Sequence, residues 1–119
     1  MLHELRAFED KTYLHQTVVR HGAELTRYLD LPEALKKETR TAGEWRIHYH
    51  VPIFLEELAS FRTTQRSLIQ LLQIQRQEPF TTHLEVETYT WDVLPERYRS
   101  VSVHEAIARE LEWVVQELA

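Results

Sequence analysis

Two stretches carry the strongest structural signal in the chain: Trp45-Arg46-Ile47-His48-Tyr49-His50-Val51-Pro52-Ile53-Phe54 and Thr82-His83-Leu84-Glu85-Val86-Glu87-Thr88-Tyr89-Thr90-Trp91. Both alternate between apolar and polar residues, which places successive side chains on opposite faces of a β-strand. The apolar faces carry Trp45, Ile47, Tyr49 and Val51, then Leu84 and Val86. The polar faces carry Arg46, His48 and His50, then His83, Glu85 and Glu87. The alternation therefore predicts one strand at 45–54 and another at 82–91.

The segment between these two strands is long enough for a helix, so the strands are predicted to be parallel neighbours joined by a right-handed crossover. Parallel sheets are normally covered on both faces, and a covered polar face must be paired or line a cavity. In a barrel of parallel strands that face is the interior, and we expect His50 and Glu87 at its mouth, where the strands end. The alternative is a sheet whose polar face is solvent-facing or only ion-paired.

The rest of the chain is predicted to be mainly helical, because only two glycines and four prolines interrupt 119 residues. Apolar spacing predicts helices at 2–9 and 13–28, with a break at 10–12. Asp30 is a predicted N-cap, with proline and glutamate in the first turn, for a helix that ends near Thr39. Thr63 is a predicted N-cap for a helix that ends near Gln75.

A capping box at Ser102 and Glu105 predicts the start of the last helix. Apolar spacing predicts the buried stripes of the last two helices, which are Leu68, Leu71, Leu72 and Ile74, and then Ile107, Leu111, Val114, Val115 and Leu118. The charged residues of the last helix are predicted to form a solvated face, made of Arg109, Glu110, Glu112 and Glu117. The order after Gly43 is therefore strand, helix, strand, helix, which indicates an α/β fold.

The chain length limits this fold. A complete eight-stranded barrel needs about 250 residues, and the chain has 119. We therefore predict that residues 1–119 form one incomplete barrel segment, with a helical part at 1–42 and the last two β/α units at 43–119.

Composition excludes several classes of function. The net charge of −5 argues against a nucleic-acid partner. The absence of cysteine excludes disulfides, thiolate metal sites and cysteine nucleophiles. No apolar run approaches the ~20 residues of a membrane span, and the first residues lack the zones of a signal peptide. We expect a cytoplasmic protein with no membrane span.

The sequences of both strand stretches resemble the C-terminal part of the EboE family of metabolite traffic proteins. The resemblance extends back to Glu44 in the first stretch and on to Val93-Leu94-Pro95 in the second. Tyr13-Leu14-His15-Gln16 and Asp30-Leu31-Pro32-Glu33-Ala34-Leu35 are similar to the same family. The resemblance implies the xylose-isomerase-like TIM barrel of sugar phosphate isomerases and epimerases, of which this chain would be the C-terminal segment. It also implies a small polyhydroxylated metabolite as the ligand.

The resemblance further implies a site for a divalent ion such as Mn²⁺, Mg²⁺ or Zn²⁺, held by a histidine and a glutamate on late barrel strands. The histidine ligand matches His50, or less well His48, and the glutamate ligand matches Glu87. His48 and Glu85 are the candidate catalytic residues, and Glu85 is alternatively a partner of a ligand or an interior ion pair. Arg46 would bind an anionic group of the substrate. The earlier strands and their ligands are missing, so the chain alone is expected to be inactive.

Two further interpretations remain open from the sequence. His48 and His50 are separated by two positions, which suits a pair of hydrogen-bonded interior histidines as well as a metal site. The chain could also be a non-catalytic module that pairs with a partner chain and completes or regulates a barrel, or a remnant without an independent role. Open strand edges predict self-association, or a partner that supplies the missing strands.

Overall fold

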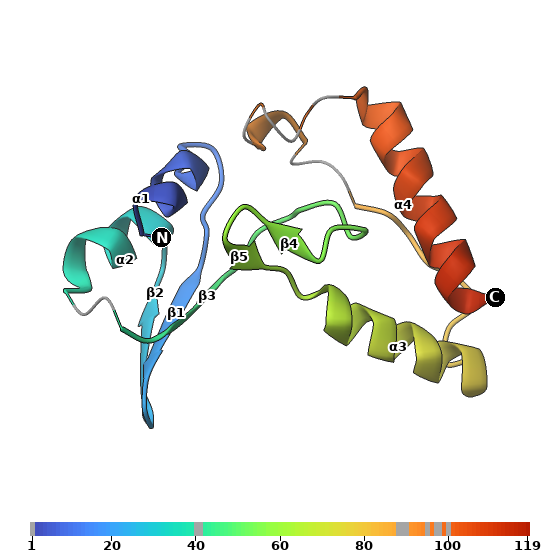
Figure 1. Cartoon of the computed structure of the whole chain (residues 1–119), viewed down its shortest axis with the longest axis horizontal. Helices are drawn as coiled ribbons and strands as arrows, with labels where there is room; N and C mark the ends of the chain where they lie inside the picture. The colour runs from blue at the N-terminus through green and yellow to red at the C-terminus, as the bar shows by residue number, and fades with distance from the viewer. Residues whose placement is uncertain (1, 40–41, 88–90, 95, 97–98, 100) are drawn as a thin grey trace. The chain divides into compact units, whose positions relative to one another are not determined.

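The computed structural model describes residues 2–39, 42–87, 91–94, 96, 99 and 101–119. They form a small α/β protein with antiparallel sheets of three and two strands (Figure 1). The chain divides into two compact units, Met1–Tyr49 and His50–Ala119. Within the described residues no parallel strand pair and no barrel is present. No helix in this part of the chain has the length and apolar character needed to cross a membrane.

The first unit is built on a sheet of order β2-β1-β3. Its strands are β1 Thr17–His21, β2 Glu24–Tyr28 and β3 Glu44–Ile47. Val19 on the central strand pairs with Thr26 on one side and with Trp45 on the other. Thr17 and Val19 are fully buried, so this face of β1 is directed toward the core of the unit.

The helix predicted for residues 13–28 is wrong, because β1 and β2 form a hairpin there. The β-branched run Thr17-Val18-Val19 favours a strand, and its side chains alternate in burial. Gly22 has a φ of 61° and occupies the first position of the two-residue turn, where a type II′ hairpin requires positive φ. The turn at Gly22 and the pairing of the two strands therefore determine the secondary structure here, and the apolar spacing that predicted a helix does not.

The helices of the first unit lie where the sequence predicted helices at 2–9 and after Asp30. α1 Leu2–Leu5 continues as the 3₁₀ helix η1 Arg6–Phe8, within the predicted 2–9. α2 Leu31–Lys37 begins after Asp30, whose carboxylate accepts hydrogen bonds from the N–H groups of Leu31 and His15, both at 2.9 Å. Asp30 thus caps the helix and fixes the strand that follows His15. The buried residues of the unit are Leu5, Phe8, His15, Thr17, Val19, Leu31 and Ala34.

Gly43 leads the chain into β3. A Cβ at this position would lie 2.7 Å from Cε1 of His21 and 2.8 Å from the carbonyl oxygen of Arg20. Only glycine therefore fits without movement of β1. Nε2 of His21 also lies 3.4 Å from the Glu38 carboxylate, which connects the end of β1 to the residue after α2.

The first predicted long strand is shorter than expected, and the second is absent from the described residues. β3 covers only Glu44–Ile47, and residues 48–52 have no strand structure. Residues 82–87 are irregular, and 88–90 lie outside the described residues. A strand needs a hydrogen-bonding neighbour, and β3 finds one in β1. The segment 82–87 has no strand beside it among the described residues, so its alternation does not become a strand.

The second unit contains a short hairpin and two longer helices. Its elements are β4 Glu57–Leu58, β5 Phe61–Arg62, α3 Gln65–Gln77, the 3₁₀ helix η2 Trp91–Val93 and α4 Val103–Leu118. α3 begins two residues after the predicted N-cap, and Oγ1 of Thr63 accepts a hydrogen bond from the Gln65 N–H at 3.2 Å. α4 begins as predicted, because the Ser102 hydroxyl accepts a hydrogen bond from the Glu105 N–H at 3.2 Å. The two helices contact each other.

The buried sides of α3 and α4 differ from the prediction. On α4, Ala106 and Glu110 are buried, whereas Leu111 is 47% exposed and Val115 is 67% exposed. On α3, Leu72 is buried, whereas Leu71 and Ile74 are exposed. The second unit does not provide enough neighbouring surface to cover the whole apolar stripe of either helix.

Candidate functional site

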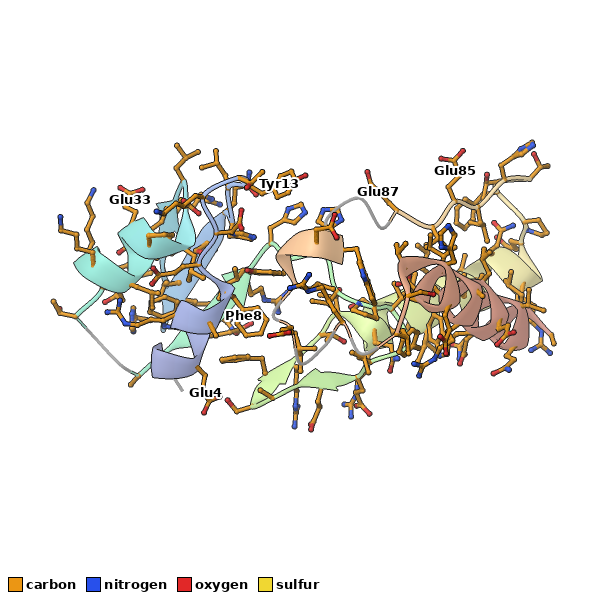
Figure 2. The ribbon with its side chains drawn as sticks, turned by 90° about the horizontal axis from the view of Figure 1, so that it is seen from above. Glu4, Phe8, Tyr13, Glu33, Glu85 and Glu87 are labelled. Atoms are coloured by element: carbon orange, nitrogen blue, oxygen red, sulfur yellow. The ribbon has the colours of Figure 1, made fainter. Side chains whose placement is uncertain are left out.

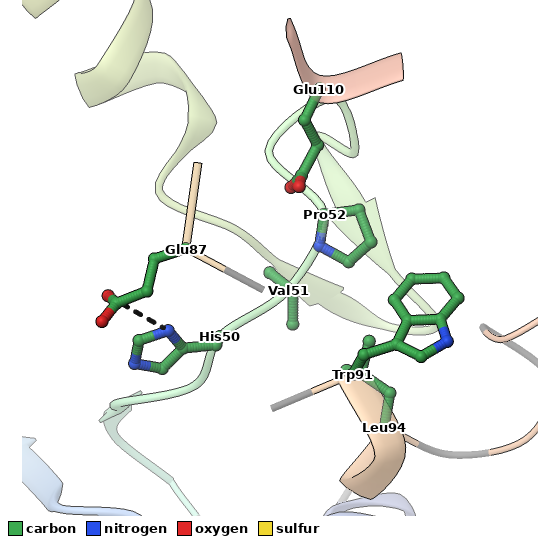
Figure 3. Close-up of a pocket in the computed structure, with 7 residues that line it drawn as sticks. All are labelled: His50, Val51, Pro52, Glu87, Trp91, Leu94 and Glu110. Carbon is green, nitrogen blue, oxygen red and sulfur yellow. Dashed lines mark ion pairs between the residues drawn. The ribbon is translucent and has the colours of Figure 1, made fainter. Parts of the chain in front are cut away.

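The second unit contains a pocket next to the irregular segment that begins at His50 (Figure 3). The space around these residues is about 250 Å³ only when open solvent is included, so the pocket is a shallow hollow and not an enclosed cavity. The lining residues are His50, Val51, Pro52, Glu87, Trp91, Leu94 and Glu110. The wall is thus mainly apolar, with one imidazole and two carboxyl groups, which is the usual composition of a small-molecule site.

The wall formed by residues 50–53 is held in place at the peptide groups of Ile53. The Ile53 N–H donates to Oε1 of Glu110 at 3.0 Å, and the Ile53 carbonyl accepts from Nε2 of Gln65 at 2.9 Å. Leu55 donates back to the carbonyl of Pro52 at 3.1 Å, which closes a turn. The Arg109 guanidinium lies over the Phe54 ring at 4.3 Å. An irregular segment is therefore fixed by side chains from both α3 and α4.

His50 and Glu87 come together at one side of this pocket. Nδ1 of His50 lies 3.9 Å from Oε2 of Glu87, as the dashed line in Figure 3 marks. This distance is too long for a hydrogen bond and is an ion pair only when the imidazole is protonated. The His50 side chain is 27% exposed and that of Glu87 is 68% exposed, so a ligand can reach both groups.

Glu110 is the buried acid of the pocket. The residue is 4% exposed, and Figure 3 shows its carboxyl group directed from α4 toward Pro52. Oε1 is bound by the Ile53 N–H, whereas Oε2 is buried and has no hydrogen-bond partner among the described residues. Burial raises the pKa of this carboxyl above its ordinary value, although the Ile53 N–H acts in the opposite direction.

The remaining predicted site residues lie elsewhere. Arg46 is on β3 in the first unit, where its Nε donates to the Glu44 carboxylate at 2.7 Å. That hydrogen bond, together with one from Arg20, lowers the pKa of Glu44. His48 follows β3 and is exposed, with its N–H donating to the carbonyl of Gln16 at 2.9 Å.

Glu85 is exposed on the same irregular segment as Glu87. Figure 2 shows the two carboxylates on the same side of the ribbon. Glu85 does not line the pocket, whereas Glu87 does. The catalytic roles of Glu85 and of His48, which belongs to the first unit, stay predictions.

The residues of the pocket meet only part of the requirement of a divalent ion. An imidazole nitrogen and a carboxylate oxygen are suitable donors for Mn²⁺ or Zn²⁺. Among the described residues, however, no group of three or more His, Asp or Glu side chains is arranged to hold a metal. Catalytic zinc sites normally have three protein ligands. His50 and Glu87 could hold a resident ion only together with ligands from elsewhere.

Sequence reasoning missed Glu110, which it assigned to a solvated face, and Trp91, which it assigned only to the end of a strand. The sequence carried no signal for Glu110, because the apolar spacing of this helix predicted a buried stripe that does not include its face. In the structure Glu110 follows the buried Ala106 by four residues, and residues at i and i+4 share one face of a helix.

Comparisons with protein-family models, with curated proteins and with solved structures gave no significant match.

Proposed function

We propose that the chain is the C-terminal segment of an EboE-like protein of the sugar phosphate isomerase and epimerase type, with a xylose-isomerase-like TIM barrel. When the barrel is complete, the protein acts on a small polyhydroxylated metabolite with the help of a divalent ion. Mn²⁺, Mg²⁺ and Zn²⁺ are the candidate ions, and His50 and Glu87 supply two of its ligands. The family resemblance gives the class of reaction.

One observation supports the proposal more than any other. His50 and Glu87 were selected from the sequence as the metal ligands, and in the second unit they lie 3.9 Å apart beside a pocket. Metal bonds to nitrogen and oxygen are about 2 Å long, so two such ligands can lie up to about 4 Å apart. The pair therefore has the chemistry and the spacing of two ligands.

The side chains of the pocket have separate roles in this proposal. Trp91, Leu94 and Pro52 exclude water and bind the carbon skeleton of the metabolite. His50 and Glu87 bind its polar end. A bound divalent ion would add the polarisation of a carbonyl or hydroxyl group, which eases the movement of a proton.

The first test measures the binding of Mn²⁺ to the protein. Paramagnetic broadening in NMR spectra detects even weak binding, and we expect it to begin at His50 and Glu87. We expect Glu87→Gln to weaken Mn²⁺ binding by about tenfold or more, because a charged ligand is lost. Glu85→Gln is the matched control, since Glu85 is exposed two residues away on the same segment, and it should bind Mn²⁺ like the unchanged protein. Equal binding by Glu87→Gln and the unchanged protein would refute the assignment.

A second candidate is a non-catalytic module that pairs with a second copy or with another chain. It is favoured by residues 82–87, which alternate like a strand but have no strand beside them among the described residues. An exposed extended segment is a site on which a strand of another chain can add. Its test is the state of association of the protein in solution.

A further inference from the structure

Oε2 of Glu110 is an unused hydrogen-bonding group in the wall of the pocket. It is buried, it has no partner among the described residues, and its sister oxygen is fixed by the Ile53 N–H at 3.0 Å. Leaving a buried polar atom unpaired is unfavourable. A buried group that is held in one orientation beside a cavity is suited to bind a ligand there.

The charge of the pocket restricts the class of this ligand. The residues that line it include two carboxyl groups and one histidine, and none of the described lining residues is a lysine or an arginine. A phosphate or carboxylate would therefore meet Glu87 without a permanent positive charge to pair with. The described lining residues therefore favour an uncharged ligand.

The protonation of Glu110 decides what it offers to the ligand. A neutral carboxylic acid has one O–H donor, whereas a carboxylate only accepts. Burial favours the neutral acid. The apolar side chains of Val51, Pro52 and Leu94 give the same wall a low polarity.

We propose that the pocket binds a neutral polyol or the uncharged end of a sugar, and that Oε2 of Glu110 donates a hydrogen bond to one of its hydroxyl oxygens. The indole of Trp91 packs against the carbon skeleton. This inference rests on the proposed function for the polyhydroxylated nature of the metabolite. It adds Glu110 as a binding residue and assigns any phosphate of the metabolite to a place outside the pocket.

The test uses the full chain with a chelator present, so that no metal contributes. D-ribose and ribose 5-phosphate are the probes, and the indole N–H signal of Trp91 in NMR spectra is the readout. We expect ribose to shift this signal and to bind more tightly than ribose 5-phosphate. We expect Glu110→Leu to weaken ribose binding by about tenfold, which corresponds to the ~1.4 kcal/mol of one hydrogen bond.

Two variants separate binding from folding. Glu110→Gln keeps an acceptor for the Ile53 N–H and an N–H donor in place of Oε2, so it should bind ribose within about threefold of the unchanged protein. Glu112→Leu removes an exposed glutamate from the same helix and should leave binding unchanged. If Glu110→Leu does not fold, the comparison of ribose with ribose 5-phosphate in the unchanged protein still tests the inference, because tighter binding of ribose 5-phosphate would overturn it.

Three results would overturn the inference: no shift of the Trp91 signal by ribose, tighter binding of ribose 5-phosphate, or equal affinity of Glu110→Leu and the unchanged protein. The result with Mn²⁺ is independent of these. Ribose binding that depends on Glu110, without Mn²⁺ binding at His50 and Glu87, would refute the proposed metal site and leave the inference standing. Mn²⁺ binding at His50 and Glu87 without ribose binding would support the proposed metal site and overturn the inference.

Discussion

At the scale of single residues, Glu110 links the pH to the stability of the protein. Burial raises its pKa above the ordinary value of 4.5, so the folded protein holds this proton more tightly than the unfolded chain does. The resulting stabilisation is complete below pH 4.5 and is lost as the pH rises through the pKa of the folded state. We expect Glu110→Gln to be more stable than the unchanged protein at neutral pH and to lose less stability between pH 4.5 and 7. Urea titrations across this range measure the effect.

Glu112→Gln is the control for this prediction, because Glu112 is exposed on the same helix. It should keep the pH dependence of the unchanged protein. If Glu110→Gln also keeps that dependence, the proton of Glu110 is held no more tightly in the folded state, and the neutral donor of the further inference loses its basis.

Single residues also show where sequence reasoning succeeds. The alternation in the two stretches selected His50 and Glu87, and the structure brings them within 3.9 Å although no strand holds either of them. Their role as metal ligands stays a prediction. Glu110 was missed because charge alone suggested a solvated position, whereas its helical phase relative to Ala106 places it on the buried side.

At the scale of elements, the turn of the β4–β5 hairpin stores backbone strain. Ala59 has a φ of 57°, a conformation that costs a residue with a Cβ about 1 kcal/mol or more. We expect Ala59→Gly to raise the free energy of unfolding by about 0.5–1 kcal/mol, because relief of this strain exceeds the entropy lost by glycine on folding. NMR spectra recorded during a urea titration follow each unit by its own signals and measure the change.

The β1–β2 hairpin provides a matched control for Ala59→Gly. Ala23 also lies in a two-residue turn, but its φ is not positive. The same substitution there relieves no strain, so Ala23→Gly should lower the free energy of unfolding by about 0.5–1 kcal/mol. A destabilising effect at both positions would show that Ala59 is not strained.

Elements were predictable from sequence where local signals were sufficient. α2 and α4 begin at the predicted caps, because Asp30 and Ser102 bind backbone N–H groups of their own helices. The β1–β2 hairpin was missed because the helix predicted for residues 13–28 rested on apolar spacing, which does not take into account the turn that Gly22 forms with its positive φ. The strand at 82–91 was predicted from alternation, but a strand also needs a neighbour, and alternation does not show whether one exists.

At the scale of the whole molecule, the second unit exposes several large apolar side chains. The exposed large apolar residues of His50–Ala119 are Leu71, Ile74, Phe80, Leu84, Leu111 and Val115. Contiguous patches of such residues mark interaction sites. Together with the segment 82–87, which has no strand beside it among the described residues, they predict that the protein associates with a second copy or with another chain.

We therefore expect the average mass measured by light scattering to rise with protein concentration. Leu111 and Val115 lie four residues apart on α4 and share one face of it, and burial of each is worth about 1.5–3 kcal/mol. The double variant Leu111→Lys, Val115→Lys should therefore shift the equilibrium to single chains. Glu112→Gln with Gln116→Lys changes the charge equally at exposed neighbouring positions and should still associate. If the unchanged protein has the mass of one chain at every concentration, its exposed apolar residues do not mediate self-association, and the search for a partner turns to other chains.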